Sequence, residues 1–155
     1  MRRNGFSLIE VSIAIFILAM LIAVSVPTFV RSFNDMTLRE TARGFATTCQ
    51  LARIEAVQHQ TNVVLHIDLD QQRFWLAREG EETLIKNWEV SRRVTLVAAE
   101  LAGNPSREER SIGVNFYPNG TCDSATIVIR GAEKHGLAAT IDPITCKAIA
   151  YPVKP

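Results

Sequence analysis

The sequence lacks the motifs with which common enzymes hold nucleophiles, metals and phosphates. It has no H-E-x-x-H, no G-x-S-x-G and no glycine-rich phosphate loop. Its three cysteines include no C-x-x-C pair, and its histidines, at positions 59, 66 and 135, are scattered along the chain. These absences argue against a catalytic centre, a metal site and a bound cofactor. We therefore expect a protein that is not an enzyme.

The chain also lacks a strong excess of either charge. Seventeen lysines and arginines face sixteen aspartates and glutamates, for a formal net charge of +1. A protein dedicated to nucleic acid normally carries a basic patch that neutralises phosphates. Arg130, Lys134 and Lys147 are the candidates for a small patch of this kind, for DNA or another partner. A solvated sheet edge is the more favoured interpretation, so nucleic acid is allowed as a partner but not favoured.

What the sequence does contain is a long apolar run near its amino terminus. From Phe6 to Val26 the only charged residue is Glu10. As a helix the run would span roughly 31 Å, which matches the ~30 Å hydrocarbon core of a bilayer. A cleaved secretory signal would be shorter and end in a small-residue site, whereas Pro27 follows this run. We therefore expect residues 6–26 to stay in the membrane, in contact with its lipid.

The charges before the run predict its orientation. Arg2 and Arg3 precede it, and basic residues near a membrane span favour the cytoplasmic side. The chain is therefore expected to cross a membrane once. Its amino terminus would be cytoplasmic, and the residues after the span would lie outside the cytoplasm.

Glu10 requires an explanation, because an acidic residue at mid-helix costs about 2.5–3.5 kcal/mol on membrane-insertion scales. The run offers it no basic partner. Cleavage after Gly5 would create one, since Phe6 would then carry a free α-amino group four residues from Glu10. The amine of one subunit could pair with Glu10 of the next, and two buried charges stabilise each other only when paired. Glu10 is therefore predicted to act in assembly.

These residues resemble the amino-terminal signal of type IV pilins and type II secretion pseudopilins. The match consists of a short basic leader, Gly5 before the cut, Phe6, Glu10 at the fifth mature position and Pro27 at the twenty-second. The resemblance implies a leader of residues 1–5, removed by a prepilin peptidase between Gly5 and Phe6. It also implies N-methylation of Phe6 and a role for Glu10 in filament assembly. A protein of this kind would lie in a bacterial inner membrane with its head in the periplasm, and then in the filament.

The helix is expected to continue beyond the apolar run. Pro27 should kink it, because proline removes one helical hydrogen bond and clashes with the preceding turn. An apolar stripe at helical spacing follows, made of Leu38, Ala42, Phe45, Cys49, Ala52 and Ala56. Such a stripe is typical of a helix packed on a core. We therefore expect residues 27–60 to form an amphipathic helix that ends near His59.

From residue 61 the pattern changes to short runs of β-branched and aromatic residues between turn-rich pieces. The runs cover residues 62–68, 73–77, 83–88, 94–98, 112–117, 125–129, 137–141 and 148–151. They predict an antiparallel, meander-like sheet with the helix stripe over one face. The expected fold class is therefore α+β, type IV pilin-like, with a long amino-terminal helix on a β-rich head of residues 61–155.

The head resembles the H-type minor pseudopilins and the FimT- and FimU-like minor pilins. The residues that carry this resemblance, in two turns that precede strands, are Phe116, Pro118, Gly120, Asp142, Pro143 and Lys147. Cys146 stands where the family usually has glycine. The resemblance implies a filament subunit near the tip, with other pseudopilins or minor pilins as partners.

Two functions are compatible with this resemblance. In the first, the chain is a minor pseudopilin of a type II secretion system, which exports folded proteins. In the second, it is a minor pilin that primes a type IV pilus and contacts DNA for uptake. The near-neutral head favours secretion.

The cysteines suit a head outside the cytoplasm, where a disulfide can stay oxidised. Cys122 and Cys146 open two strands whose starts a meander would bring to the same end of the sheet. They are the expected disulfide, and Cys49 on the stripe is expected to be a buried apolar residue. A metal site is the alternative interpretation of the cysteines.

Overall fold

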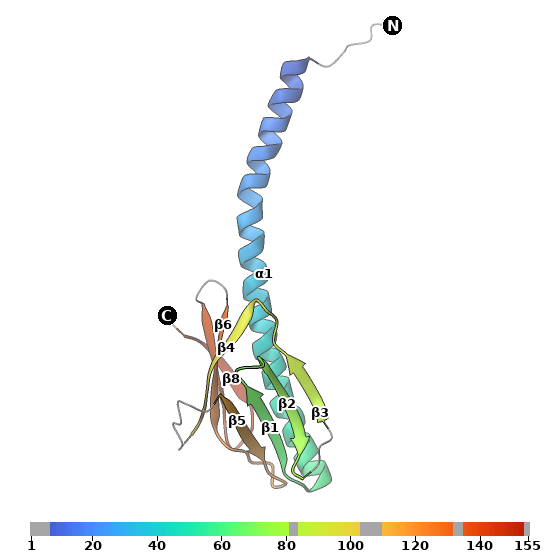
Figure 1. Cartoon of the computed structure of the whole chain (residues 1–155), viewed down its shortest axis with the longest axis vertical. Coiled ribbons are helices and arrows are strands. Elements are labelled where there is room, and N and C mark those ends of the chain that lie inside the picture. The colour runs from blue at the N-terminus through green and yellow to red at the C-terminus, as the bar shows by residue number, and fades with distance from the viewer. Residues whose placement is uncertain (1–6, 81–83, 103–109, 132–134, 154–155) are drawn as a thin grey trace. The chain divides into compact units, whose positions relative to one another are not determined.

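The structure, a computed structural model, describes residues 7–80, 84–102, 110–131 and 135–153, with the side chains of residues 23–34 left out. It divides into two compact units, Met1–Phe33 and Asn34–Pro155. Along the chain, a long helix precedes the strands (Figure 1).

The helix α1 (Leu8–His59) ends at the residue predicted for it. It has 52 residues and continues through Pro27 without interruption of its helical backbone. The side chain of Pro27 lies outside the description, so the kink stays a prediction. The left-handed φ of 52° at Gln60 marks the end of the helix.

In the part of the chain that the structure describes, eight strands follow, and each overlaps one of the runs predicted from the sequence. They are β1 (Val63–Asp68), β2 (Arg73–Arg78), β3 (Leu84–Glu89), β4 (Val94–Leu101), β5 (Ser111–Phe116), β6 (Ala125–Gly131), β7 (Gly136–Ile141) and β8 (Ala148–Val153). In most of them buried and less buried residues alternate, which is the period-2 pattern of a half-buried strand. The predicted α+β class is confirmed.

The strands form two antiparallel sheets rather than one. The first has the order β3-β2-β1-β5 (Figure 1). The second has the order β4-β6-β7-β8. The prediction of a single meander-like sheet was wrong, because β5 does not pair with β4. It returns to pair with β1, where Phe116 lies opposite Val63. Each sheet still contains a three-strand meander, β1 to β3 in the first and β6 to β8 in the second.

The core of the second unit forms where α1 packs on the inner faces of both sheets. All six residues of the predicted stripe are buried, and Phe45 and Cys49 are completely inaccessible. The ring of Phe45 meets Phe74 of β2 edge-on, with centroids 5.6 Å apart. Ile127 of β6 belongs to the same cluster. One helix face therefore fills the space between the two sheets, as expected of a packed α+β domain.

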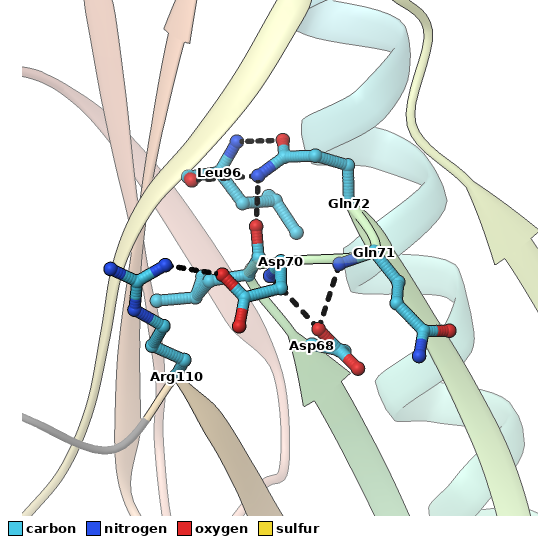
Figure 2. Close-up of polar contacts among 7 residues, drawn as sticks. Asp68, Asp70, Gln71, Gln72, Leu96 and Arg110 are labelled. Carbon is cyan, nitrogen blue, oxygen red and sulfur yellow. Dashed lines mark hydrogen bonds and ion pairs between the residues drawn. The ribbon is translucent and has the colours of Figure 1, made fainter.

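A side-chain amide joins the two sheets at the turn after β1. The amide of Gln72 accepts a hydrogen bond from the Leu96 N–H over 2.7 Å and donates one to the Leu96 carbonyl over 3.1 Å (Figure 2). The same amide nitrogen donates to the carbonyl of Leu69. Gln72 therefore takes the place that a neighbouring strand would have beside β4.

The carboxylates in this turn are used to hold its backbone. Asp68 accepts hydrogen bonds from the N–H groups of Asp70 and Gln71 over 2.9 and 2.8 Å (Figure 2). Asp70 forms an ion pair of 2.7 Å with Arg110. Both carboxylates are therefore part of ordinary turn chemistry.

Candidate functional site

The predicted assembly residue Glu10 lies in the first turn of α1. Its side chain is exposed and forms no ion pair with any residue that the structure describes. Apolar residues one and two turns further along, Ala14 and Leu18, share its face of the helix. Gly5 and Phe6 lie outside the described residues, so cleavage and methylation at these positions stay predictions.

The helix around Glu10 is apolar on every side. The large apolar side chains from Leu8 to Ile22 are between 46% and 85% exposed. A helix with no polar face is not stable as an isolated element in water and needs lipid or partner helices around it. In the part of the chain that the structure describes, no helix is at once long enough and apolar enough to cross a membrane.

In the second unit the structure brings Cys122 and Cys146 together at one end of the second sheet. The Cys122 N–H donates to the carbonyl of Pro143 over 3.0 Å, and the Cys146 thiol lies 3.5 Å from the carbonyl of Gly120. All three cysteines are free thiols in the structure. The disulfide between Cys122 and Cys146 is therefore not formed in it and stays a prediction.

Burial determines the chemistry of these thiols. It raises the pKa of Cys49, Cys122 and Cys146 above that of an ordinary thiol. The thiolate is the reactive form, so a raised pKa makes each thiol slow to react while the head is folded. Any bridge between Cys122 and Cys146 is therefore expected to form before folding is complete.

The backbone of Cys146 has a conformation that glycine adopts more readily than cysteine. Its φ of 52° lies in the left-handed region, which costs a residue with a side chain about 1–2 kcal/mol. The Cys146 N–H donates to the Asp142 carbonyl over 2.8 Å, and its carbonyl accepts from the amide of Gln50 over 2.8 Å. These bonds hold the strained conformation.

Asp142 organises the same turn. Its carboxylate accepts hydrogen bonds from the Thr145 N–H over 2.7 Å and from the Thr145 hydroxyl over 2.9 Å. The Thr145 N–H is the main cause that lowers the pKa of Asp142. The aspartate–proline pattern of the sequence is therefore the capped start of a tight turn.

Arg53 of α1 connects the two turns that carry the family resemblance. Its guanidinium donates to the carbonyl of Gly120 over 3.1 Å and to the carbonyl of Thr145 over 3.3 Å. Together with Gln50, it ties the helix to the end of the sheet that holds Cys122 and Cys146. Sequence reasoning missed both residues, because they lie off the apolar stripe and local patterns do not identify contacts across the fold.

Two of the basic residues proposed for DNA or another partner, Arg130 and Lys147, lie at different levels of the second sheet. Arg130 is near the end of β6 and lies opposite Gly136 of β7. Gly136 in turn lies opposite Val153, the last residue of β8, so Arg130 is level with that end of β8. Lys147 immediately precedes β8 at its other end. Six residues of strand separate these levels, which is about 20 Å. Lys134 lies outside the described residues.

Comparison with known proteins identifies the amino-terminal segment. The family model of the prokaryotic N-terminal methylation motif matches residues 1–26, which include Gly5, Phe6 and Glu10. A search of curated proteins finds no match to the sequence.

Comparison with solved structures identifies the fold. The crystal structure of the minor pseudopilin EpsH from the type II secretion system of Vibrio cholerae matches with a TM-score of 0.59 at 15% identity, over 79% of this chain and 96% of that one. A second EpsH structure matches with a TM-score of 0.53 at 15% identity, over 76% of this chain and 97% of that one.

The type IV minor pilin FimU of Pseudomonas aeruginosa matches with a TM-score of 0.52 at 18% identity, over 76% of this chain and 93% of that one. At such identities the likeness shows the fold. The predicted resemblance to type IV pilin-like proteins with an H-type head is thus confirmed by the motif and by the fold.

Proposed function

We propose that the chain is a non-enzymatic minor pseudopilin of a type II secretion system. The observation that carries this proposal is the combination of a methylation motif over residues 1–26 with a head of the fold of EpsH. Each is found in filament subunits, and no described feature of the head suggests catalysis. The subunit would assemble near the filament tip and help to export folded proteins.

In this proposal the amino-terminal segment has two successive environments. Residues 6–26 would first hold the precursor in the inner membrane, with residues 1–5 in the cytoplasm and the head in the periplasm. Prepilin peptidase would then cut between Gly5 and Phe6, and the new amino group of Phe6 would be methylated. The exposed apolar surface from Leu8 to Ile22 would next be covered by the helices of other subunits.

Glu10 would set the position of each new subunit. Its carboxylate forms no ion pair with a residue that the structure describes, and apolar side chains surround it on its face of α1. A charged group in such surroundings is stable only with a partner. The Phe6 amine of an adjacent subunit would supply it, so a subunit in the wrong register would leave two buried charges unpaired.

The test is mass spectrometry of the protein, cross-linked and purified from its native membranes. We expect an amino terminus at a methylated Phe6 and cross-links to secretion pseudopilins. An unprocessed amino terminus in the native membrane would contradict the proposal. A purely membrane-tethered protein, working alone, would give that result.

A minor pilin that primes a type IV pilus is the second candidate function. It is supported by the match to FimU, whose TM-score is close to that of the EpsH structures. Cross-links to pilus subunits and pilus-tip proteins would favour it. The separation of Arg130 from Lys147 does not support one basic surface for DNA at these residues.

A further inference from the structure

A groove in the second unit lies between α1 and β3 and is not explained by the proposed function. It encloses about 450 Å³. Its walls carry Arg39 and Arg43 from the helix, Lys86 from the strand and one acidic side chain, Glu40. Trp88 and Met36 supply the apolar surface.

The three cations of the groove outnumber its one carboxylate, that of Glu40. Arg39 and Arg43 are exposed and one helical turn apart, a spacing at which like charges repel by a few tenths of a kcal/mol. Lys86 lies with its ammonium 5.9 Å from the centre of the Trp88 ring. None of the three side chains forms an ion pair with a residue that the structure describes.

The floor of the groove is built by a close fit between Gly44 and Trp88. A Cβ atom on Gly44 would lie 2.6 Å from the Trp88 ring, so only glycine admits the ring here. Glycine inside a helix costs roughly 0.5–1 kcal/mol relative to alanine. On one face Trp88 stacks on Phe74, with centroids 6.1 Å apart and an interplanar angle of 7°. The ring is therefore held in a fixed position.

We infer that this groove binds an acidic segment of a neighbouring filament subunit. An apolar side chain of that segment would contact Trp88 and Met36, which is 66% exposed. Carboxylates beside it would pair with Arg39, Arg43 and Lys86, since guanidinium groups bind carboxylates through paired hydrogen bonds. The volume is suited to a few side chains rather than to a folded surface. The inference rests on the proposed function for the identity of the neighbour.

Two other anionic partners fit the groove less well. A strand of nucleic acid needs a continuous track of cations for its phosphates, whereas Glu40 interrupts this one. A lipid headgroup would have to reach Met36, which follows Val26 by ten residues or about 15 Å of helix. The headgroup layer is only roughly 5–8 Å thick. An acidic peptide segment remains the occupant that matches both charge and size.

The test uses tryptophan fluorescence of the full chain in detergent micelles. The chain has two tryptophans, so Trp75→Phe leaves Trp88 as the only reporter. The probe is a synthetic peptide in which leucines alternate with pairs of glutamates. We expect the emission of Trp88 to shift and saturate with this peptide. The same peptide with glutamines in place of the glutamates should bind at least about tenfold more weakly.

Charge-removing variants locate the site. The double variant Arg39→Gln and Arg43→Gln should weaken peptide binding about tenfold or more. It removes the two guanidinium groups that would pair with the carboxylates of the peptide. The matched pair Arg130→Gln and Lys147→Gln removes the same charge outside the groove and should leave binding unchanged. Equal loss in both pairs, or no loss in the first pair, would overturn the inference. So would tighter binding of a single-stranded oligonucleotide or of phosphatidylglycerol vesicles.

A photo-cross-linker placed at Thr47, beside the groove, tests the occupant in native membranes. We expect it to cross-link to an acidic segment of another filament subunit, and Arg39→Gln with Arg43→Gln should abolish that product. A cross-link to a chain without acidic residues at the contact would overturn the inference. If the peptide binds but Phe6 is not exposed by processing, the proposed function fails and the site stands. If processing is normal but the peptide does not bind, the site fails and the function stands.

Discussion

The two parts of α1 have the same backbone and opposite surfaces. From Leu8 to Ile22 every large apolar side chain is at least 46% exposed, and Leu8 reaches 85%. In the second unit, the apolar residues of the stripe from Leu38 to Ala56 are at most 6% exposed. The first part is apolar all round, whereas the second has one apolar face and carries its charged residues elsewhere.

The difference shows that the distribution of side chains, not helix formation, decides what each part does. The second part buries its apolar face within the chain, against residues such as Phe74. The first part leaves its large apolar side chains exposed. A helix that is apolar all round is stable only in apolar surroundings, so the two parts should respond differently to mutation.

The largest effect is expected for Glu10→Ala in the first part. The variant should insert and be cut normally, but its incorporation into filaments should be almost abolished, because the Phe6 amine of a neighbour would lose its partner. Immunoblots of the filament and membrane fractions measure this, with the mature amino terminus confirmed by mass spectrometry. Wild-type levels of incorporation would contradict the pairing of Glu10 with the amine.

Phe45→Ala should have a large effect in the second part. Removing a completely buried ring typically costs about 3–5 kcal/mol of unfolding free energy. Denaturant unfolding, followed by the near-UV signal of the head, measures the loss. Leu18→Ala is the matched control on the same helix and should leave head stability within about 0.5 kcal/mol. Equal losses of unfolding free energy in the two variants would contradict the distinction between the two parts of the helix.

The state of Cys122 and Cys146 shows whether the head is stabilised by its packed core alone or also by a disulfide. Closing the loop between Cys122 and Cys146 would add about 3 kcal/mol in the chain-entropy model. Thiol counting on mature protein, purified without reductant and then denatured, should find one free thiol, that of Cys49. Three free thiols would show that packing alone sustains the head.

A smaller effect is expected where the two sheets are joined. Gln72→Ala would leave the N–H and carbonyl of Leu96 without their amide partner, at a cost of about 1–3 kcal/mol. Gln71→Ala, at the exposed neighbouring position, is the control and should cost little. Urea unfolding of the two variants gives the comparison. A neutral Gln72→Ala would mean that water replaces the amide without loss.

The smallest effect is a pH dependence confined to the head. His66 stacks on Trp75, with centroids 5.1 Å apart, and burial lowers its pKa below 6.5. The unfolded chain binds a proton at His66 more readily than the folded head does. The contribution of neutral His66 to the stability of the head is therefore complete above about pH 6.5 and is lost as the pH falls through the pKa of His66 in the folded head. The melting temperature of wild type should therefore fall more than that of His66→Gln between pH 7.5 and 5.5. Parallel curves would refute this.

Much of the fold could be predicted because it depends on local patterns. The stripe on α1, the helix end at His59 and the positions of eight strands follow from periodicity and turn residues. The division into two sheets could not be predicted, because the pairing of β5 with β1 is decided by packing across some fifty residues of sequence.

The sites show the same limit. The meander from β6 to β8 brings Cys122 and Cys146 together as the sequence suggested, whereas the contacts of Arg53 and Gln50 depend on how α1 lies against distant turns. Trp88 packs against Gly44 only because glycine has no Cβ atom, and no pattern in the sequence indicates that the two residues meet. The processing residues Gly5 and Phe6 are recognisable only by their motif.

The amide of Gln72 has one further consequence, for solubility. An uncovered strand edge is a template on which other chains can aggregate. By occupying the backbone groups of Leu96, Gln72 blocks β4 to an incoming strand without adding a charge to the interior. At this edge of the second sheet, Gln72 therefore makes it harder for a strand of another molecule to pair with β4.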